Sequence, residues 1–206
     1  MARTAAIIAL AAVSAGLGAA GWFALAPSDG EDRFAECREV KLAAASAIGG
    51  PFTLTSETGA RMTSAELFDR PTLLYFGYTY CPDVCPVDTA RNAEAVEILE
   101  ERGVELRPAF ITIDPQRDDA KMVGDFTANL HPKMIGLTGT EEEIAKVAKD
   151  WRVYRAKAGD DPEDYLMDHS TFTYLVAPGG DLLEVFRREH SAEQIADRAA
   201  CFIDKL

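Results

Sequence analysis

Residues 75–86 read YFGYTYCPDVCP, and the fold of the whole chain can be worked out from this stretch. An apolar run over residues 72–76 leads into it, and a segment with helical periodicity, 84–102, leads out of it. Cys81 and Cys85 therefore fall where a predicted strand passes into a predicted helix. If the first helical turn already includes Cys81, the i, i+4 spacing places both side chains on one helix face.

Two thiols at such a junction suit two chemistries. The pair can close a reversible disulfide, or both thiolates can bind one soft metal ion. A helix N-terminus lowers the pKa of a thiol there, and both chemistries use the thiolate form. The stretch by itself leaves open whether the pair is a redox centre or part of a metal site.

The overall composition argues against some classes of partner. The 206 residues include 21 Lys and Arg against 34 Asp and Glu, which gives a formal net charge of −13. Nucleic acid and anionic lipid are poor partners for such a chain, because phosphate binding relies on clustered cations. The simplest interpretation is a soluble, acidic surface, and the alternative is a preference for a basic partner surface.

The N-terminal region predicts export of the domain. Residues 5–26 carry no charge, Arg3 precedes them, and the run is long enough to span a bilayer. Arg3 predicts a cytoplasmic N-terminus. We predict an inner-membrane anchor over 1–28, a linker or short helix over 29–48, and a periplasmic domain over 49–206. The alternative is a cleaved signal, because residues 24–26 fit a signal-peptidase site.

Export bears on the four cysteines, because an oxidising compartment permits disulfides. Cys37, Cys81, Cys85 and Cys201 allow three connectivities. If Cys81 pairs with Cys85, Cys37 would pair with Cys201 and tie the segment after the anchor to the last helix. The alternative is that Cys37 and Cys201 are two free, half-buried thiols.

The rest of the pattern alternates strands with helices, which predicts an α/β domain with a central mixed β-sheet flanked by helices. The cysteine pair at the first strand-to-helix junction is the thioredoxin arrangement, here with an added N-terminal β-hairpin. Capping boxes stand at 63–66, 140–143 and 191–194, and Gly103 ends the first long helix. Strands are predicted at 52–55, 72–76, 106–113, 134–137, 151–155, 171–176 and 182–186, and helices at 84–102, 119–129, 141–151 and after 191.

A third ligand must come from the three histidines. His131 lies between a predicted helix and strand, and His190 lies at a helix cap, so surface roles are expected for both. His169 immediately precedes the strand 171–176, in a loop that would lie over the cysteine turn of a thioredoxin-like sheet. A single histidine is a weak signal, so spacing alone does not make it a ligand.

Four motifs together resemble the SCO/SenC family of copper-binding assembly factors for cytochrome c oxidase. They are CPDVCP at 81–86, IDPQRD at 113–118, GLTG at 136–139 and DYLMDHS at 164–170. The resemblance runs from about Gly50 to Phe202. It implies that Cys81, Cys85 and His169 are copper ligands. It also implies a metallochaperone that delivers copper to the dinuclear copper A site of oxidase subunit II.

The donor set agrees with what the resemblance implies. Two thiolates and one imidazole form a soft set that suits Cu(I), and also Cu(II) if an oxygen ligand joins. Zn(II) would accept the same donors with a fourth ligand. Asp168 is a candidate to orient His169, whereas Asp83 and Asp114 are interpreted as turn or cap residues. The partners implied are oxidase subunit II, a thioredoxin-like reductant and a periplasmic copper donor.

A thiol–disulfide oxidoreductase that reduces the copper-site cysteines of the oxidase subunit is the alternative function. Three residues, 82–84, separate the cysteines, whereas dedicated thioredoxins use two, and this difference favours metal binding. A peroxidase is disfavoured, because Thr79 precedes the first cysteine but no arginine partner can be assigned. The chain is therefore not expected to be an enzyme, apart from an accessory oxidoreductase activity.

Overall fold

The computed structural model describes residues 32–38, 48–159, 161 and 164–206, and residues 34–206 form one compact unit. The predicted membrane anchor lies outside the described residues. Within the described part of the chain, no helix is both long enough and apolar enough to cross a bilayer.

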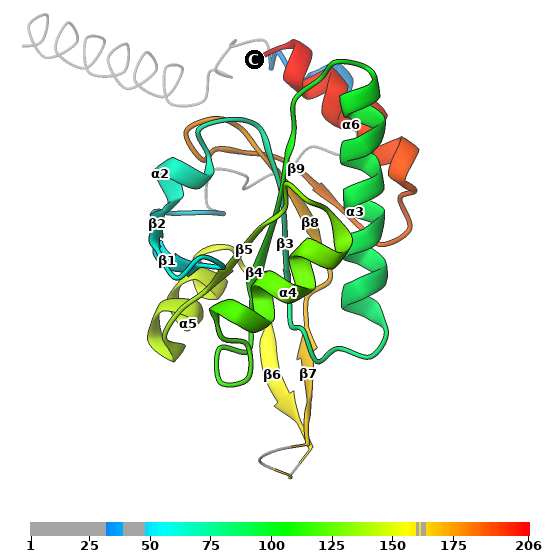
Figure 1. The fold of residues 1–206 in the computed structure, drawn as a ribbon. Helices are drawn as coiled ribbons and strands as arrows, with labels where there is room; N and C mark the ends of the chain where they lie inside the picture. The colour runs from blue at the N-terminus through cyan, green and yellow to red at the C-terminus, as the bar shows by residue number, and fades with distance from the viewer. Residues whose placement is uncertain (1–31, 39–47, 160, 162–163) are drawn as a thin grey trace, which may run out of the picture. The chain divides into compact units, whose positions relative to one another are not determined.

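A seven-stranded mixed sheet forms the centre of this unit, in the order β2-β1-β5-β4-β3-β8-β9 (Figure 1). Strands β3, β4 and β5 run parallel, and the other pairings are antiparallel. All of β3 is buried, as expected for a strand covered on both faces. The bounds are Thr53–Ser56 for β1, Arg61–Thr63 for β2, Thr72–Gly77 for β3, Arg107–Thr112 for β4, Ile135–Thr138 for β5, Thr173–Val176 for β8 and Leu182–Phe186 for β9.

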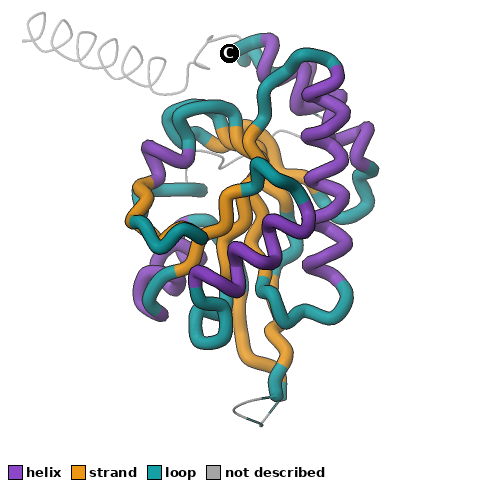
Figure 2. The backbone as a smooth tube through the Cα atoms, viewed as in Figure 1, coloured by secondary structure: helices purple, strands orange, loops and turns teal. Residues whose placement is uncertain are grey.

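Helices cover both faces of this sheet (Figures 1 and 2). Helix α3 packs against α4 and α6 on the face to which Leu73 belongs. Phe76 lies on the other face, since side chains alternate along a strand, and there it packs against Trp151 at the end of α5. The bounds are Ala35–Cys37 for the short 3₁₀ helix η1, Ser64–Leu67 for α2, Val84–Glu101 for α3, Ala120–Leu130 for α4, Glu141–Asp150 for α5 and Ala192–Asp204 for α6.

The helix boundaries follow the capping chemistry read from the sequence. Thr63, Thr140 and Ser191 each accept a hydrogen bond from the third residue of their helix and complete a capping box. Gly103 follows α3 with φ +75°, the left-handed conformation that glycine adopts without a Cβ penalty. The structure confirms these predictions. They could be made from the sequence because each cap depends only on contacts between residues close in sequence.

Strands β6, Arg155–Ala158, and β7, Leu166–His169, form a separate antiparallel ribbon that extends beyond the main sheet (Figure 1). The predicted strand at 151–155 is wrong. Trp151 ends α5 and is fully buried, and Arg152 has φ 57°, so the chain turns before β6 begins. The predicted loop before residue 171 is also wrong, because it contains β7.

A disulfide joins η1, near the start of the compact unit, to its last helix. Cys37, in η1, forms a disulfide with Cys201 in α6, with Cα atoms 5.7 Å apart. Phe34 packs against Phe202 beside it, with ring centroids 5.4 Å apart. Part of the segment interpreted as a linker therefore belongs to the compact unit.

Candidate metal centre

The two remaining cysteines lie in the turn between β3 and α3 and are free thiols. Helix α3 begins at Val84, because Asp83 has a non-helical backbone conformation with φ −141° and ψ −72°. Cys81 therefore precedes the helix, so the condition under which one helix face would carry both thiols is not met. The backbone brings them together instead, since the N–H of Cys85 donates a hydrogen bond to Cys81 Sγ over 3.3 Å.

His169 is the last residue of β7, and its ring faces the buried cysteine. Its Nδ1 lies 2.7 Å from the carbonyl oxygen of Ser170. A carbonyl only accepts, so we assign the imidazole proton to Nδ1, which leaves an unprotonated Nε2. That Nε2 lies 3.3 Å from Cys85 Sγ. Two donors that bind one ion at about 2.0–2.3 Å lie roughly 3–4 Å apart, so the spacing suits a shared metal ion.

The pKa values of the three groups shift in different directions. Burial raises the pKa of the Cys81 thiol, but hydrogen bonds from the backbone of Cys85 and Asp83 outweigh it, and the pKa lies below its usual value. Burial raises the pKa of Cys85, so the expected lowering at the helix N-terminus is wrong for this residue. Burial also lowers the pKa of His169, which keeps the imidazole neutral near pH 7.

Two tyrosines and a glycine shape the space around these donors. Tyr75 and Tyr78 pack edge-on against the His169 ring, with centroids 6.4 and 5.8 Å away. At Gly77, an added Cβ would lie 2.9 Å from a carbon of Tyr75 and 3.1 Å from Cys85 Sγ, closer than side-chain carbons pack. Glycine at this position therefore lets the cysteine pack directly against the end of β3.

Asp118 holds the cysteine turn in place, a role that the sequence analysis did not assign. Its buried carboxylate accepts hydrogen bonds from the Thr79 N–H over 2.9 Å and the Thr79 hydroxyl over 2.6 Å. The Thr112 hydroxyl donates a third over 2.6 Å. The available signal was the position of Asp118 at the end of the IDPQRD motif, 113–118, which does not reveal a contact 39 residues away in sequence.

Arg117 joins the cysteine turn to the ribbon. Its Nε donates to Asp114 over 2.6 Å, and the Tyr165 hydroxyl donates to the same carboxylate over 2.8 Å. The guanidinium carbon lies 3.6 Å from the ring centroid of Tyr165 and 4.9 Å from that of Tyr80. Asp114 is thus more than a turn residue, since its contacts fix the ribbon that carries His169.

A buried carboxylate, Asp88, lies one helical turn after Cys85. It accepts a hydrogen bond from the Tyr75 hydroxyl over 3.1 Å and pairs with Arg188 over 3.2 Å. Arg91 lies 3.5 Å from it and also binds the Arg188 carbonyl oxygen. Asp88 was not among the predicted site residues, although the i, i+3 spacing from Cys85 places it on the same side of α3.

Asp168 does not orient His169, which corrects that expectation. Adjacent residues of a strand point to opposite faces, and Asp168 is exposed on the face of β7 away from the imidazole. The Ser170 carbonyl takes the orienting role. His131 is also misassigned as a solvated residue, because it is buried and its Nδ1 accepts the N–H of Lys133.

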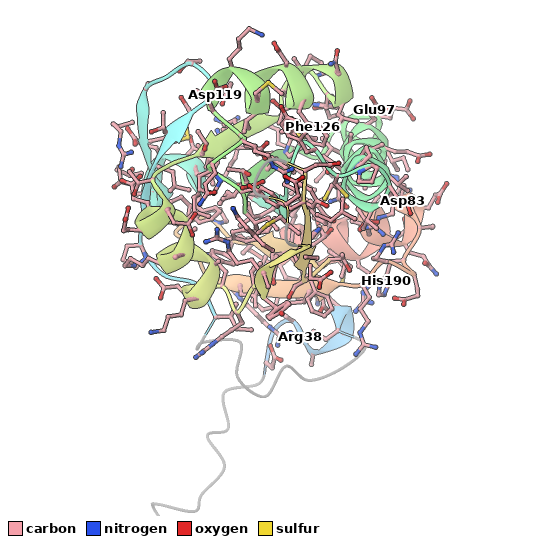
Figure 3. All side chains as sticks on the ribbon, turned by 90° about the horizontal axis from the view of Figure 1, so that it is seen from below. Arg38, Asp83, Glu97, Asp119, Phe126 and His190 are labelled. Carbon is pink, nitrogen blue, oxygen red and sulfur yellow. A yellow bond between two sulfur atoms is a disulfide. The ribbon has the colours of Figure 1, made fainter. Side chains whose placement is uncertain are left out.

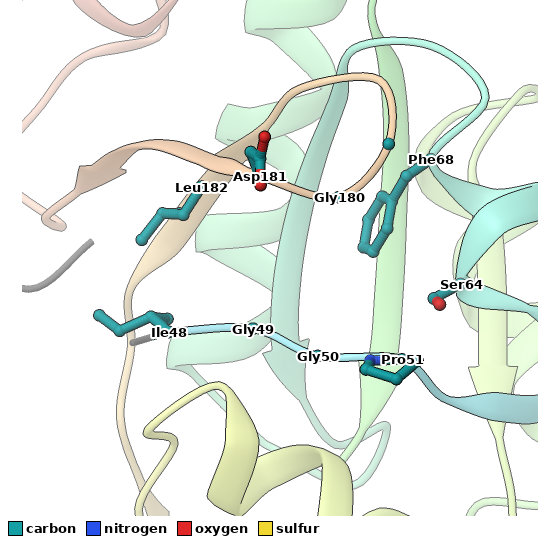
Figure 4. A pocket seen from close by; sticks show the side chains of 10 residues that line it. Ile48, Gly49, Gly50, Pro51, Ser64, Phe68, Gly180, Asp181 and Leu182 are labelled. Atoms are coloured by element: carbon teal, nitrogen blue, oxygen red, sulfur yellow. The ribbon is translucent and has the colours of Figure 1, made fainter. Parts of the chain in front are cut away.

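No three His, Cys, Asp or Glu side chains of the described residues are already gathered as a metal-binding group. Cys81, Cys85 and His169 are therefore candidate donors whose final geometry depends on the ion. A cavity of about 580 Å³ lies beside the β8–β9 turn, at the end of β3 remote from the cysteines (Figure 4). Its lining contains no cysteine or histidine, so it offers no competing soft-metal site.

Comparison with known proteins gives consistent matches. The SCO1/SenC family model matches residues 40–204. Protein SenC of Rhodobacter capsulatus is 46% identical over 204 residues, which cover 99% of this chain and 92% of that protein. The mitochondrial SCO1 homolog 1 of Arabidopsis thaliana is 41% identical over 161 residues, 78% of this chain and 48% of that protein, so the chain matches about half of it. The crystal structure of Arabidopsis thaliana ScoI with copper bound has a TM-score of 0.71 at 40% identity, covering 77% of this chain and 98% of that one.

Proposed function

The chain belongs to the SCO1/SenC family, and from this we propose that it is a copper metallochaperone with Cys81, Cys85 and His169 as its ligands. Two thiolates and an imidazole are the soft donors that Cu(I) prefers. The copper-bound relative from Arabidopsis thaliana, which has the same fold, supports copper as the cargo.

One observation carries the ligand assignment. The Nε2 atom of His169 lies 3.3 Å from Cys85 Sγ, while its Nδ1 is held by the Ser170 carbonyl oxygen. A histidine fixed in this way presents its lone pair to the thiol, as metal-binding histidines do. A histidine without such a contact to a thiol would give no structural support for metal binding.

We propose oxidase subunit II, at its dinuclear copper A site, as the acceptor. The difference in exposure between the two thiols supports transfer, because Cys81 is partly exposed whereas Cys85 is buried. An incoming acceptor thiolate would reach the metal from the side of Cys81. We further propose that residues 1–28 anchor the protein to the inner membrane, with the domain in the periplasm, where a thioredoxin-like protein keeps the thiols reduced.

Anaerobic titration of the reduced protein with Cu(I) tests the ligand set. Wild type should bind one equivalent tightly, and His169→Ala should bind at least tenfold more weakly, because one of three donors is lost. His190→Ala is the matched control and should bind as wild type does. Equal affinity of His169→Ala and wild type would contradict the assignment.

A thiol–disulfide oxidoreductase is the second candidate, and one observation favours it. The pKa of the partly exposed Cys81 is lowered, whereas that of the buried Cys85 is raised, which is the division between an attacking and a resolving thiol. This function needs no histidine ligand. Disulfide reduction by His169→Ala at the wild-type rate, together with weak copper binding by wild type, would favour it.

A further inference from the structure

The side chain of Tyr78 joins the cysteine turn to the strand that carries His169. Tyr78 directly follows β3 and is buried. Its hydroxyl oxygen accepts a hydrogen bond from the Met167 N–H over 3.2 Å, and Met167 lies in β7 two residues before His169. Its ring packs edge-on against that histidine, with centroids 5.8 Å apart. Tyr78 therefore contacts β7 through both its ring and its hydroxyl.

The hydroxyl proton of Tyr78 is directed at the cysteine turn. A backbone N–H only donates, so the hydroxyl acts as an acceptor at Met167, and its own proton can be given to another acceptor. The Cys81 sulfur is that acceptor, because a side-chain hydrogen bond joins Tyr78 and Cys81. Burial raises the pKa of the Tyr78 phenol, so the phenol keeps this proton throughout the neutral range.

The Cys81 sulfur thus receives hydrogen bonds from several directions. The Cys85 N–H donates to it over 3.3 Å, and the backbone of Asp83 also donates to it. With the Tyr78 hydroxyl, these groups place the positive ends of their dipoles against one sulfur atom. The two N–H groups belong to the backbone, which almost any sequence supplies, whereas the hydroxyl depends on a tyrosine at position 78.

The charge of the loaded site decides which copper ion these donors favour. Two thiolates and a neutral imidazole carry one net negative charge with Cu(I) and none with Cu(II). Hydrogen-bond donors stabilise the more negative form, and they withdraw electron density that the sulfur would otherwise give to the metal. Hydrogen bonding around a cysteine sulfur is one of the factors that tune the redox potential of copper sites. The donors at Cys81 therefore favour Cu(I).

We propose that the Tyr78 hydroxyl makes the metal centre select Cu(I) over Cu(II), through its hydrogen bond to the Cys81 sulfur. The inference rests on the proposed function, because it specifies the oxidation state of the copper cargo. Tyr78 is a positioning residue in this account, since it acts on the ion through Cys81 and does not bind the ion itself.

Affinities of wild type and Tyr78→Phe for Cu(I) and for Cu(II), measured anaerobically on reduced protein by competition with a chelator for each ion, test the proposal. Phenylalanine keeps the ring contact with His169 and removes only the hydroxyl. The ratio of the Cu(I) to the Cu(II) association constant should fall about tenfold, the size of effect expected for one hydrogen bond to a charged group. This change equals a fall of about 59 mV in the potential of the bound copper.

The absorption spectrum gives a second measurement on the same variant. Loss of a hydrogen-bond donor raises the energy of the sulfur lone pairs. The thiolate-to-Cu(II) band of Tyr78→Phe should therefore move to longer wavelength than the band of wild type.

Tyr165→Phe is the matched control, because it also removes one hydroxyl that holds the ribbon. The Tyr165 hydroxyl donates to Asp114 over 2.8 Å, and no hydrogen bond among the described residues joins it to a cysteine. A loosened ribbon should weaken the binding of both copper ions by similar factors. The affinity ratio and the absorption band of this variant should therefore remain those of wild type.

The outcomes separate this inference from the proposed function. An unchanged affinity ratio in Tyr78→Phe would overturn the inference. An equal change of the ratio in Tyr165→Phe would also overturn it, because the effect would then come from the ribbon rather than from the sulfur. Either result would leave copper binding by wild type, and hence the proposed function, intact. If wild type bound neither ion, the proposed function would be rejected and this inference with it.

Discussion

Cys81 and Cys85 are separated by three residues, yet their surroundings give them different chemical properties. Backbone N–H groups stabilise the Cys81 thiolate, whereas burial favours the protonated thiol of Cys85. A metal ion bound by the proposed ligands would supply the positive charge that favours the buried Cys85 thiolate. With the proposed ligand set, copper and the two cysteine protons would compete for the same sulfur atoms.

This competition predicts that Cu(I) affinity falls as pH falls. The pKa of Cys85 is raised, so this thiol is protonated throughout the neutral range and copper must displace its proton. The association constant should therefore rise about tenfold per pH unit from pH 6 to 8, and more steeply wherever Cys81 also loses its proton on binding. The pKa of His169 is lowered, so its protonation adds to the loss only below pH 6.5. Competition titrations with a Cu(I) chelator across this range measure the slope, and a flat profile would contradict thiolate ligation.

Asp88 is predicted to position the metal centre without binding the ion. It links the Tyr75 hydroxyl to Arg188, and thereby fixes α3 beside a ring that packs against His169. Asp88→Asn should weaken copper binding about 10- to 100-fold, the cost typical of an outer partner of a ligand. It should also shift the thiolate-to-Cu(II) absorption band, while Asp88→Glu restores part of the affinity.

A matched control separates positioning from general stability. Asp197→Asn removes the ion pair between Arg102 and α6 at the far end of α3, 2.6 Å long in the structure. Copper binding by this variant should equal that of wild type. Equal weakening by Asp88→Asn and Asp197→Asn would show that the effect comes from loosening α3 as a whole.

At the scale of elements, the cysteine turn depends on a contact from another loop. Asp118→Ala would leave the Thr79 N–H and the Thr112 hydroxyl without their buried acceptor. The free energy of unfolding should fall by about 2–6 kcal/mol, because each of the two orphaned donors costs about 1–3 kcal/mol. Copper affinity should fall as well, since Thr79 lies two residues before Cys81.

The adjacent residue provides the control for this prediction. Asp119 (Figure 3) caps α4 through a 2.8 Å hydrogen bond from the Met122 N–H, and no hydrogen bond or ion pair among the described residues joins its side chain to the cysteine turn. Asp119→Ala should cost about 1 kcal/mol of stability, as loss of an N-cap does, and leave copper affinity unchanged. Denaturant unfolding and copper titration of both variants measure the difference. The account of Asp118 is wrong if the two variants behave alike.

The elements also show which features can be predicted from sequence. The capping boxes, the buried parallel strands and the β8–β9 hairpin depend on local patterns, and the structure confirms them. The ribbon was missed because β6 and β7 have four residues each. Their pairing, which sets Arg155 opposite His169, also joins residues that are 14 positions apart in the sequence. The start of α3 at Val84 was predicted correctly, but Cys81 lies before the first turn, because the conformation of Asp83 sets the start of the helix.

The residues of the candidate site also divide into those that could be predicted from the sequence and those that could not. Cys81, Cys85 and His169 could be proposed because their residue types and motif order carry the resemblance. Asp88 and Asp118 could not be assigned, because a buried carboxylate is recognised by what it contacts, and those contacts come from distant elements. The group that orients His169 could not be predicted from the sequence either, because it is a backbone carbonyl and every residue type has one.

At the scale of the whole molecule, the disulfide and the candidate metal centre lie at opposite ends of α3. The 18 residues of this helix span about 27 Å. Cys37 and Cys201 close a loop with a sequence separation of 164, for which chain entropy predicts a stabilisation of about 5 kcal/mol. Measured effects of native disulfides are often smaller, about 2–5 kcal/mol.

The double variant Cys37→Ser/Cys201→Ser should therefore unfold more easily but bind copper as wild type does. We expect a loss of about 2–5 kcal/mol in the free energy of unfolding, with unchanged Cu(I) affinity of the folded protein. Denaturant unfolding followed by copper titration measures both quantities on one sample. A large loss of copper affinity in the folded variant would show that the two cysteine pairs are coupled, which contradicts their separation.

X-ray absorption spectroscopy of the reduced protein loaded with one equivalent of Cu(I) tests the central claim most directly. The ligand set Cys81, Cys85 and His169 predicts two sulfur neighbours and one imidazole nitrogen around copper. In His169→Ala the imidazole scattering should disappear while both sulfur neighbours remain. A wild-type spectrum with no imidazole contribution, or with fewer than two sulfur neighbours, would contradict the account.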